Sequence, residues 1–316
     1  MVNKAPKSAS DVQLAIPGNR FGKPSPLTKA EIADLVERFA IASKACKDAG
    51  FTGVQIHGAH GYLISQFLSP RANLRTDEYG GSLENRARFL LEIVAAVRSA
   101  VGPSFPIGVK LNSADFQKGG FEFDDSITVV KWLEQASVDM MEISGGSYEQ
   151  PRLMGQDGID ADDGPKVAPS TAAREAYFVD FAKAMQAHVN IPLMVTGGFR
   201  TRAAMEQALE AGAADAIGLG RPMCLMTDAP KRLLEGADEL PRYEDGLGLI
   251  PNWLGFLKGL QMTKAIDGFA GIYWFYEQLW MIGNQGKADE DFSVFKAFRI
   301  VDARNKALMR ARADMI

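Results

Sequence analysis

Five short apolar segments, each preceded by a stretch with helical spacing, constrain the fold of this chain more than any other feature. The apolar segments cover residues 54–56, 106–111, 138–143, 191–196 and 214–219. The helical stretches cover residues 27–49, 82–101, 126–135, 170–189 and 201–211. Strands that alternate with helices of this length indicate βαβ units and a parallel sheet. Because the segments are apolar throughout, we expect both faces of the sheet to be buried.

The expected helix ends carry their own signals. Thr28 is placed to cap the first helix and Gly50 to end it. Ser82, which follows a double glycine, is placed to cap the second helix. These residues support the boundaries that the periodicity gives.

Polar and glycine residues follow the strands directly, at positions His57, Asn112, Ser144, Gly145, Gly146, Gly197, Gly198, Gly220 and Arg221. In a (βα)8 TIM barrel, the loops after the strands form the active face. We therefore predict an α/β fold of this type. A doubly wound open sheet is the alternative, but it normally shows a glycine-rich turn after its first strand, and none is evident in the sequence.

The number of strands falls short of a closed barrel. Eight strands require three more βα units of about 30 residues each, and neither the first 26 residues nor the C-terminal stretch supplies them. We expect about five βα units over residues 27–228 and a helical extension over 241–316, together one domain spanning 1–316. The aromatic residues of the extension are expected to pack helices onto the barrel or onto another subunit, and its basic end from Arg304 is expected to face solvent.

Charge and composition exclude several classes of function. The net charge is −4 without a basic stripe, which argues against nucleic-acid binding. No apolar run approaches the ~20 residues of a membrane span, and the first residues lack an apolar signal core, so we expect a cytoplasmic protein without a membrane partner. Cys46 and Cys224 fit no metal or redox spacing.

Two of the three histidines, His57 and His60, lie in the stretch GVQIHGAHGYLISQFLSP, and Tyr62 follows them. Taken alone, such a pair indicates a metal site or two packed histidines. A zinc site requires a third protein ligand, and His188 lies in a different expected helix. We therefore expect no metal.

The wider sequence carries a more specific pattern. The histidine pair and the tyrosine are followed by R-x-D-x-Y-G-G-S-x-x-N-R, and then by IGVKLNSADF, DMMEISGGSYE, MVTGGFR and AIGLGRPM. Over roughly residues 15–228 the chain closely resembles the old yellow enzyme family of FMN-dependent NAD(P)H oxidoreductases. In that family these segments are the fourth to eighth βα units, so the resemblance implies that the first three are absent.

The resemblance implies a reaction and its residues. NADH or NADPH reduces FMN, and a hydride then passes to the C=C bond of an activated alkene such as an enone or enal. His57 and His60 would donate hydrogen bonds to the substrate oxygen that gains negative charge, and Tyr62 would protonate the α-carbon. Tyr148 would border the substrate pocket, although a surface loop is an equal reading for it.

The resemblance also implies the FMN site. Lys110 would lie against the N1–O2 edge of the flavin. Independently, a charged residue inside an apolar strand is costly unless it is paired. Gly197, Gly198, Gly220 and Arg221 follow the last two strands, where barrels commonly bind phosphate.

Arg71, Arg75, Asp77, Tyr79 and Arg86 are expected to form a hydrogen-bonded loop that braces the active face, without a chemical role.

Two functions of different classes remain. The first is an FMN-dependent ene-reductase that acts on a small-molecule alkene. The second is a non-catalytic, flavin-free barrel remnant that acts as an oligomeric scaffold. Five strands leave two open edges, which favours association with further copies of the chain in a homo-oligomer.

Overall fold

The computed structural model describes residues 5–14, 21–146, 177–249 and 261–313. The fold divides into two compact units. The sheet unit holds the residues up to Phe199 together with Ala204–Gly218, and the helical unit holds Arg200–Ala203 and the residues from Leu219 onward. The expected single domain, with its extension from residue 241, stays a prediction.

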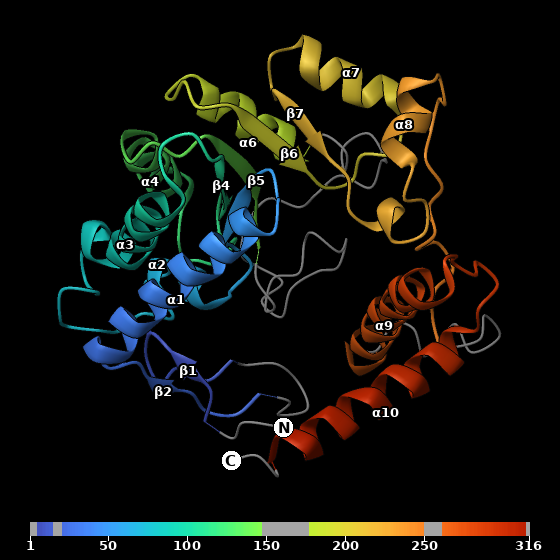
Figure 1. The fold of residues 1–316 in the computed structure, drawn as a ribbon, viewed down its shortest axis with the longest axis horizontal. Coiled ribbons are helices and arrows are strands. Elements are labelled where there is room, and N and C mark those ends of the chain that lie inside the picture. The colour runs from blue at the N-terminus through green and yellow to red at the C-terminus, as the bar shows by residue number, and fades with distance from the viewer. Residues whose placement is uncertain (1–4, 15–20, 147–176, 250–260, 314–316) are drawn as a thin grey trace. The chain divides into compact units, whose positions relative to one another are not determined.

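The sheet unit contains a five-stranded parallel sheet in which the strands follow one another in chain order (Figure 1). The strands are β3 (Val54–Gly58), β4 (Ile107–Asn112), β5 (Met140–Ser144), β6 (Leu193–Thr196) and β7 (Ala216–Gly218). Consecutive parallel strands joined by helices are βα units of a partial barrel. The α/β class and the five predicted strands are therefore confirmed.

Helices lie between the strands as the periodicity predicts. They are α1 (Lys29–Asp48), α3 (Leu83–Val101), α4 (Phe123–Gln135), α6 (Tyr177–Gln186) and α7 (Arg202–Glu210). α4 begins three residues before its predicted start. For α6, the predicted residues 170–176 lie outside the described part of the chain. The caps at Thr28 and Ser82 are confirmed, since each side chain accepts a backbone N–H of the first turn.

The two faces of the sheet differ in polarity. The expected burial of both faces holds for much of β4 and β5, where Asn112, Glu142 and Ser144 of the inner face are at most 5% exposed, but not for Gln55 on β3. The outer face is apolar and buried, with Ile56, Val109 and Ile143 at most 3% exposed. The inner face carries polar side chains at positions Gln55, His57, Lys110, Asn112, Glu142, Ser144 and Thr196. Methionines and glycines between these residues hide the period of two in the sequence.

Three short elements of the sheet unit were not expected from the sequence. The strands β1 (Lys7–Ser8) and β2 (Ser25–Pro26) pair in parallel in the N-terminal part of the sheet unit. The helix α2 (Leu63–Leu68) follows the histidine motif directly. Elements of two to six residues are too short to produce a recognisable periodicity.

The helical unit contains η2 (Arg221–Cys224), α8 (Ala229–Leu234), α9 (Gln261–Gln285) and α10 (Val294–Ala313). The predicted helical character of the C-terminal stretch is confirmed. Its aromatics pack helix on helix, because a core of Trp274, Phe275 and Ala297 joins α9 to α10.

The basic end of α10 differs from its expectation. Arg304 lies 2.5 Å from a carboxylate oxygen of Glu277, whose side chain is 3% exposed, and its guanidinium stacks 4.1 Å from the ring centre of Trp280. Arg304 therefore ties α10 to α9, and the prediction of a purely solvated face is wrong for this residue. Arginine side chains commonly pack against apolar or aromatic side chains while they keep their charge.

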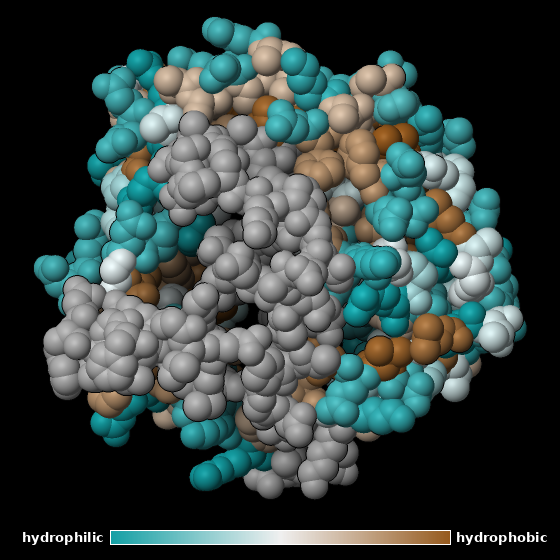
Figure 2. All heavy atoms as spheres, turned by 180° about the vertical axis from the view of Figure 1, so that it is seen from behind, coloured by the Kyte–Doolittle hydropathy of each residue, from teal (hydrophilic) through white to brown (hydrophobic). Residues whose placement is uncertain are grey.

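No helix among the described residues is long and apolar enough to cross a membrane. The surface seen in Figure 2 carries mostly hydrophilic side chains with hydrophobic ones interspersed.

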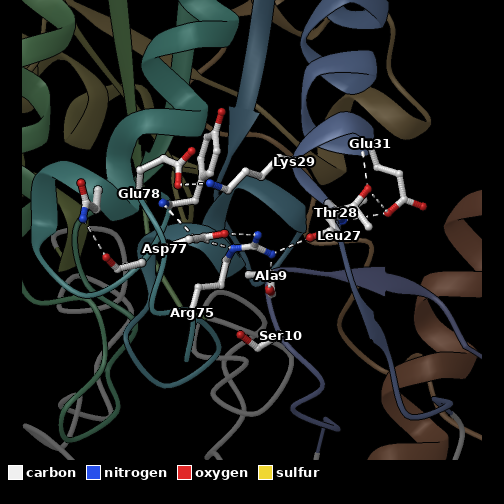
Figure 3. A network of polar contacts seen from close by, with 12 residues as sticks. Ala9, Ser10, Leu27, Thr28, Lys29, Glu31, Arg75, Asp77 and Glu78 are labelled. Carbon is white, nitrogen blue, oxygen red and sulfur yellow. Dashed lines mark hydrogen bonds and ion pairs between the residues drawn. The ribbon is translucent and has the colours of Figure 1, made fainter.

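The loop after α2 is braced as predicted (Figure 3). The Arg75 guanidinium forms a forked ion pair with Asp77, at 2.9 and 2.6 Å, and donates to the backbone carbonyls of Ala9 and Leu27. Such paired hydrogen bonds fix both distance and orientation. One side chain thus connects the loop to the N-terminal segment and to the start of α1.

The loop is further closed onto the helices that follow it. The Arg86 guanidinium donates to the carbonyls of Leu68 and Gly81 and pairs with Asp125 at 3.0 Å. The Tyr79 hydroxyl donates to Glu92 at 2.9 Å. These contacts hold the loop that follows the histidine motif.

We expect Thr28→Ala to lower the free energy of unfolding by about 1 kcal/mol. Thr28 Oγ1 accepts the Glu31 N–H and the Glu31 carboxylate accepts the Thr28 N–H, so the substitution removes one half of a reciprocal cap. Urea unfolding followed by circular dichroism measures the change. Thr128→Ala, inside α4, is the matched control and should stay within about 0.5 kcal/mol of the wild type. Equal effects of the two substitutions would contradict the cap.

Candidate active site

The end of β3 and the loop after it bring the histidine pair and the tyrosine together. The ring centre of His57 lies 5.1 Å from that of His60 and 5.1 Å from that of Tyr62. Tyr62 stands at the N-cap of α2 and its side chain is 46% exposed. The predicted grouping of these three side chains is therefore present in the structure, while their chemical roles stay predictions.

His60 is held in a conformation that few residues adopt. Its φ is +62°, in the left-handed region that is unfavourable for most side chains. Its backbone N–H donates to Asn112 Oδ1 at 3.1 Å, and its Nε2 lies 2.7 Å from Ser144 Oγ. Asn112 is itself fixed, because its amide donates to Asp115 and to the Gly146 carbonyl. Strands β4 and β5 thus determine where this imidazole lies.

Both imidazoles are held neutral. Burial, followed by the charges of Lys110 and His57, lowers the pKa of His60 to about 3 against the opposing charge of the Glu142 carboxylate. Burial and Lys110 also lower the pKa of His57, again against Glu142. Neutral imidazoles carry one N–H donor each. The pair is therefore suited to donate hydrogen bonds to a ligand oxygen.

Lys110 forms an ion pair that the sequence analysis missed. Its Nζ lies 2.7 Å from Glu142 Oε1, and the Glu142 side chain is 6% exposed. Burial alone would raise the pKa of Glu142, but the hydrogen bonds and charge of Lys110, with hydrogen bonds from Thr196 and Gln55, lower it. The cost of a charge in an apolar strand, which the sequence analysis counted in favour of a flavin contact, is therefore already offset by Glu142. The signal for its partner was the lone glutamate in the segment VDMMEI.

Gly197 and Gly198 end β6 with φ of +138° and +81°, conformations open mainly to glycine. Such turns direct backbone N–H groups outward and suit an anion. Their predicted contact with phosphate is not tested by the structure.

Gly220 and Arg221 belong to the helical unit. A side chain at Gly220 would meet no atom within 4 Å, so the backbone there is open to approach. Arg221 lies 3.2 Å from Glu244, which also pairs with Arg200. Burial and the charges of Arg200 and Arg242 lower the pKa of Arg221, against the opposing charge of Glu244. Arg221 is thus a partly buried cation, and its phosphate role stays a prediction.

Two further expectations concern residues at the margin of the site. Tyr148, expected near the substrate, lies outside the described residues. Within the described part of the chain, no group of three His, Cys, Asp or Glu side chains is arranged to hold a metal ion.

Comparison with known proteins places the chain in a family. The model of the NADH:flavin oxidoreductase / NADH oxidase family matches residues 3–239. The chain therefore belongs to this family, and the resemblance on which the sequence analysis relied is confirmed.

Individual relatives agree with the family. An NADH-dependent flavin oxidoreductase (iliE) of Hypocrea jecorina is 42% identical over 229 residues, which cover 71% of this chain and 54% of the relative. An NADH oxidase of Thermoanaerobacter brockii is 35% identical over 68% of this chain and 31% of the relative. The chain thus spans about half, or less, of the length of these curated relatives.

Solved structures share the fold. The old yellow enzyme homologue from Zymomonas mobilis aligns with a TM-score of 0.58 and 27% identity, over 74% of this chain and 62% of that chain. A 2-naphthoyl-CoA reductase complex aligns with a TM-score of 0.64 and 29% identity, over 73% and 33% of the two chains.

We expect His60→Asn to reduce the loss of stability at acid pH. The His60 pKa is about 3 in the folded chain against an ordinary value of 6.5. As the pH falls from 6.5 towards 3, the unfolded chain binds a proton here that the folded chain does not. The free energy of unfolding then falls by at most about 1.4 kcal/mol per pH unit, less where solvent screens the ring. Asparagine does not titrate and tolerates positive φ.

Urea unfolding at pH 7 and pH 5 measures this difference. His188→Asn, at an exposed turn, is the matched control for replacing a histidine by asparagine. If His60→Asn keeps the wild-type pH dependence, the imidazole is not held neutral.

Proposed function

We propose that this protein is an FMN-dependent oxidoreductase that uses NADH or NADPH to reduce the C=C bond of an activated alkene. The observation that carries the proposal is the neutral pair His57 and His60, beside Tyr62 and on the same face of the sheet as the anchored cation Lys110. Family membership supports the flavin and the nicotinamide donor. Reduction of an alkene is the part of the proposal that goes beyond family membership.

The residues present fit FMN. In the sheet unit, Lys110 supplies a cation on the inner face, and Gly197 and Gly198 adopt the open turns that anions favour. In the helical unit, Arg221 is a partly buried cation of a kind suited to phosphate. When bound, FMN would accept a hydride from NAD(P)H and deliver it to the β-carbon of the alkene. Lys110 would face the N1–O2 edge of the flavin, where negative charge develops.

The two histidines would bind the electron-withdrawing oxygen of the substrate. Neutral donors aimed at an oxygen that gains charge stabilise the transition state more than the ground state. His60 Nε2 is occupied by Ser144. For Nδ1 to carry the donated proton, the Ser144 hydroxyl must donate to Nε2. Ser144 would therefore select the tautomer of His60.

Tyr62 would supply the proton that completes the reduction. The hydride arrives at the β-carbon, and the α-carbon must then gain a proton. A phenol beside the substrate oxygen donors is suited to this transfer. The exposed position of Tyr62 at the N-cap of α2 leaves its ring open to a ligand.

A flavin-free scaffold is the second candidate. It is favoured by the two edge strands of the described sheet, β3 and β7. Open edges promote association with another chain.

The visible absorption spectrum separates the two candidates. We expect the purified chain, mixed with FMN and desalted, to keep a flavin absorption band in proportion to protein. Arg221→Gln and Lys110→Met should weaken retention, because each removes a cation proposed to face FMN. Lys231→Gln, on the exposed surface of α8, is the matched control and should not. A colourless wild-type protein would contradict the proposal and support the scaffold.

For Tyr62→Phe we expect slower alkene reduction with unchanged reduction of the flavin by NAD(P)H. The substitution removes the proton and leaves the ring, so only the second half-reaction should suffer, by about 10²-fold or more. Stopped-flow absorbance measures the two half-reactions separately. Tyr79→Phe, whose hydroxyl bonds Glu92 away from the histidines, is the matched control. Equal losses in both half-reactions would refute the proton-donor role.

A further inference from the structure

The inner face of the sheet carries a polar cluster that the proposed mechanism uses only through Lys110. It consists of Gln55, Lys110, Glu142 and Thr196, one from each of the strands β3 to β6. We propose that Glu142 is a positioning residue. Its buried carboxylate anchors the Lys110 ammonium and offsets the lysine charge at the two histidines. The part that concerns the flavin edge rests on the proposed function.

The geometry makes the pair mutually dependent. Lys110 and Glu142 are register partners on adjacent parallel strands, and their charged atoms lie 2.7 Å apart. Their side chains are 19% and 6% exposed. A carboxylate removed from water to this degree requires a partner. A buried ion pair often adds little to stability compared with apolar residues, so its place beside the histidines points to a role in the site.

The carboxylate is fixed by two further strands. The side chains of Thr196 on β6 and Gln55 on β3 both donate to Glu142. A side chain at Gly218 on β7 would bring its Cβ to 1.8 Å from Thr196 Oγ1. Glycine at that position leaves room for the threonine hydroxyl. All five strands thus contribute to holding one carboxylate.

The opposite charges of the pair act on the same two rings. The positive charge of Lys110 disfavours protonation of His57 and His60, and the negative charge of Glu142 favours it. Burial also lowers the pKa of both rings, and the neighbouring His57 lowers that of His60. Glu142 therefore moderates the field of Lys110 at the proposed substrate donors.

The anchor also suits an anionic ligand edge. A lysine ammonium has three donors, and one hydrogen bond to Glu142 leaves capacity for a ligand. A free lysine moves about four rotatable bonds. Holding it by one carboxylate directs the remaining donors before any ligand arrives, which reduces the entropy lost on binding.

Histidine titration by NMR tests the charge balance directly, because the chain has three histidines. We expect Lys110→Met to raise the pKa of His57 and Glu142→Gln to lower it, each by about 0.5 pH unit or more. The double variant should return close to the wild-type value. Loss of structure would move the ring towards solvent and towards its ordinary pKa in every variant, so opposite shifts identify an electrostatic effect.

Controls separate this role from general damage. Glu277→Gln removes the partner of Arg304, a pair between α9 and α10 whose carboxylate is likewise buried, and should leave the pKa of His57 unchanged. Because loss of one partner can destabilise a buried pair, circular dichroism of each variant accompanies the titration, and the double variant removes both charges at once. Shifts in the same direction in the two single variants, or no shift in Glu142→Gln, would overturn the proposal.

A measurement on the FMN-loaded protein distinguishes a failure of this proposal from a failure of the proposed function. In chain that retains FMN, Glu142→Gln should raise the midpoint potential of the flavin and Lys110→Met should lower it. Thr196→Val keeps the charges of Lys110 and Glu142 and the shape of the side chain. It should disturb FMN retention less than Glu142→Gln or Lys110→Met. If wild-type chain retains no FMN, the proposed function fails while the His57 titration still decides the role of Glu142. If FMN is retained and the potential does not move, Glu142 does not act on the flavin.

Discussion

The register of the five parallel strands is the constraint on which the site depends. Because side chains alternate between faces, the pairing of His57 with Lys110, and of Lys110 with Glu142, places all three on one face. A slip of one residue in either pairing would send a charged side chain into the apolar outer layer. That layer is formed by residues such as Val109 and Ile143, which have no exposed surface. Burial of the outer face therefore fixes the geometry of the inner one.

A second constraint is electrostatic. The proposed function requires a cation near two imidazoles that stay neutral, and a nearby cation itself disfavours their protonation. Burial and Lys110 act in the same direction on His57 and His60, while Glu142 limits the effect. The carboxylate also removes the cost of a lysine inside a strand. One ion pair thus affects both folding and the protonation of the proposed donors His57 and His60.

Much of this could be predicted from the sequence, for physical reasons. The helices were visible because each has apolar residues at helical spacing, and the strands because each is a short apolar run between two helices. The histidine motif was specific because its residues are close in sequence. The alternation of the strands was hidden by Met140, Met194 and Gly108, which are apolar or small on the polar face. Glu142 escaped notice because its partner is 32 residues away, and only register brings the two together.

The helical unit contains a comparable ion pair. Arg221 pairs with Glu244, as Lys110 pairs with Glu142. If Arg221 binds the phosphate of FMN as proposed, this partly buried cation needs a counter-charge while the ligand is absent. Glu244 has a second partner in Arg200, at 2.5 Å. Arg221 can therefore contact a phosphate without leaving the Glu244 carboxylate unpaired. Lys110 differs, because neighbouring strands fix the Glu142 carboxylate, and its ammonium must bind this carboxylate and a ligand together. We therefore expect Arg221 to leave Glu244 when phosphate binds, and Lys110 to stay paired with Glu142.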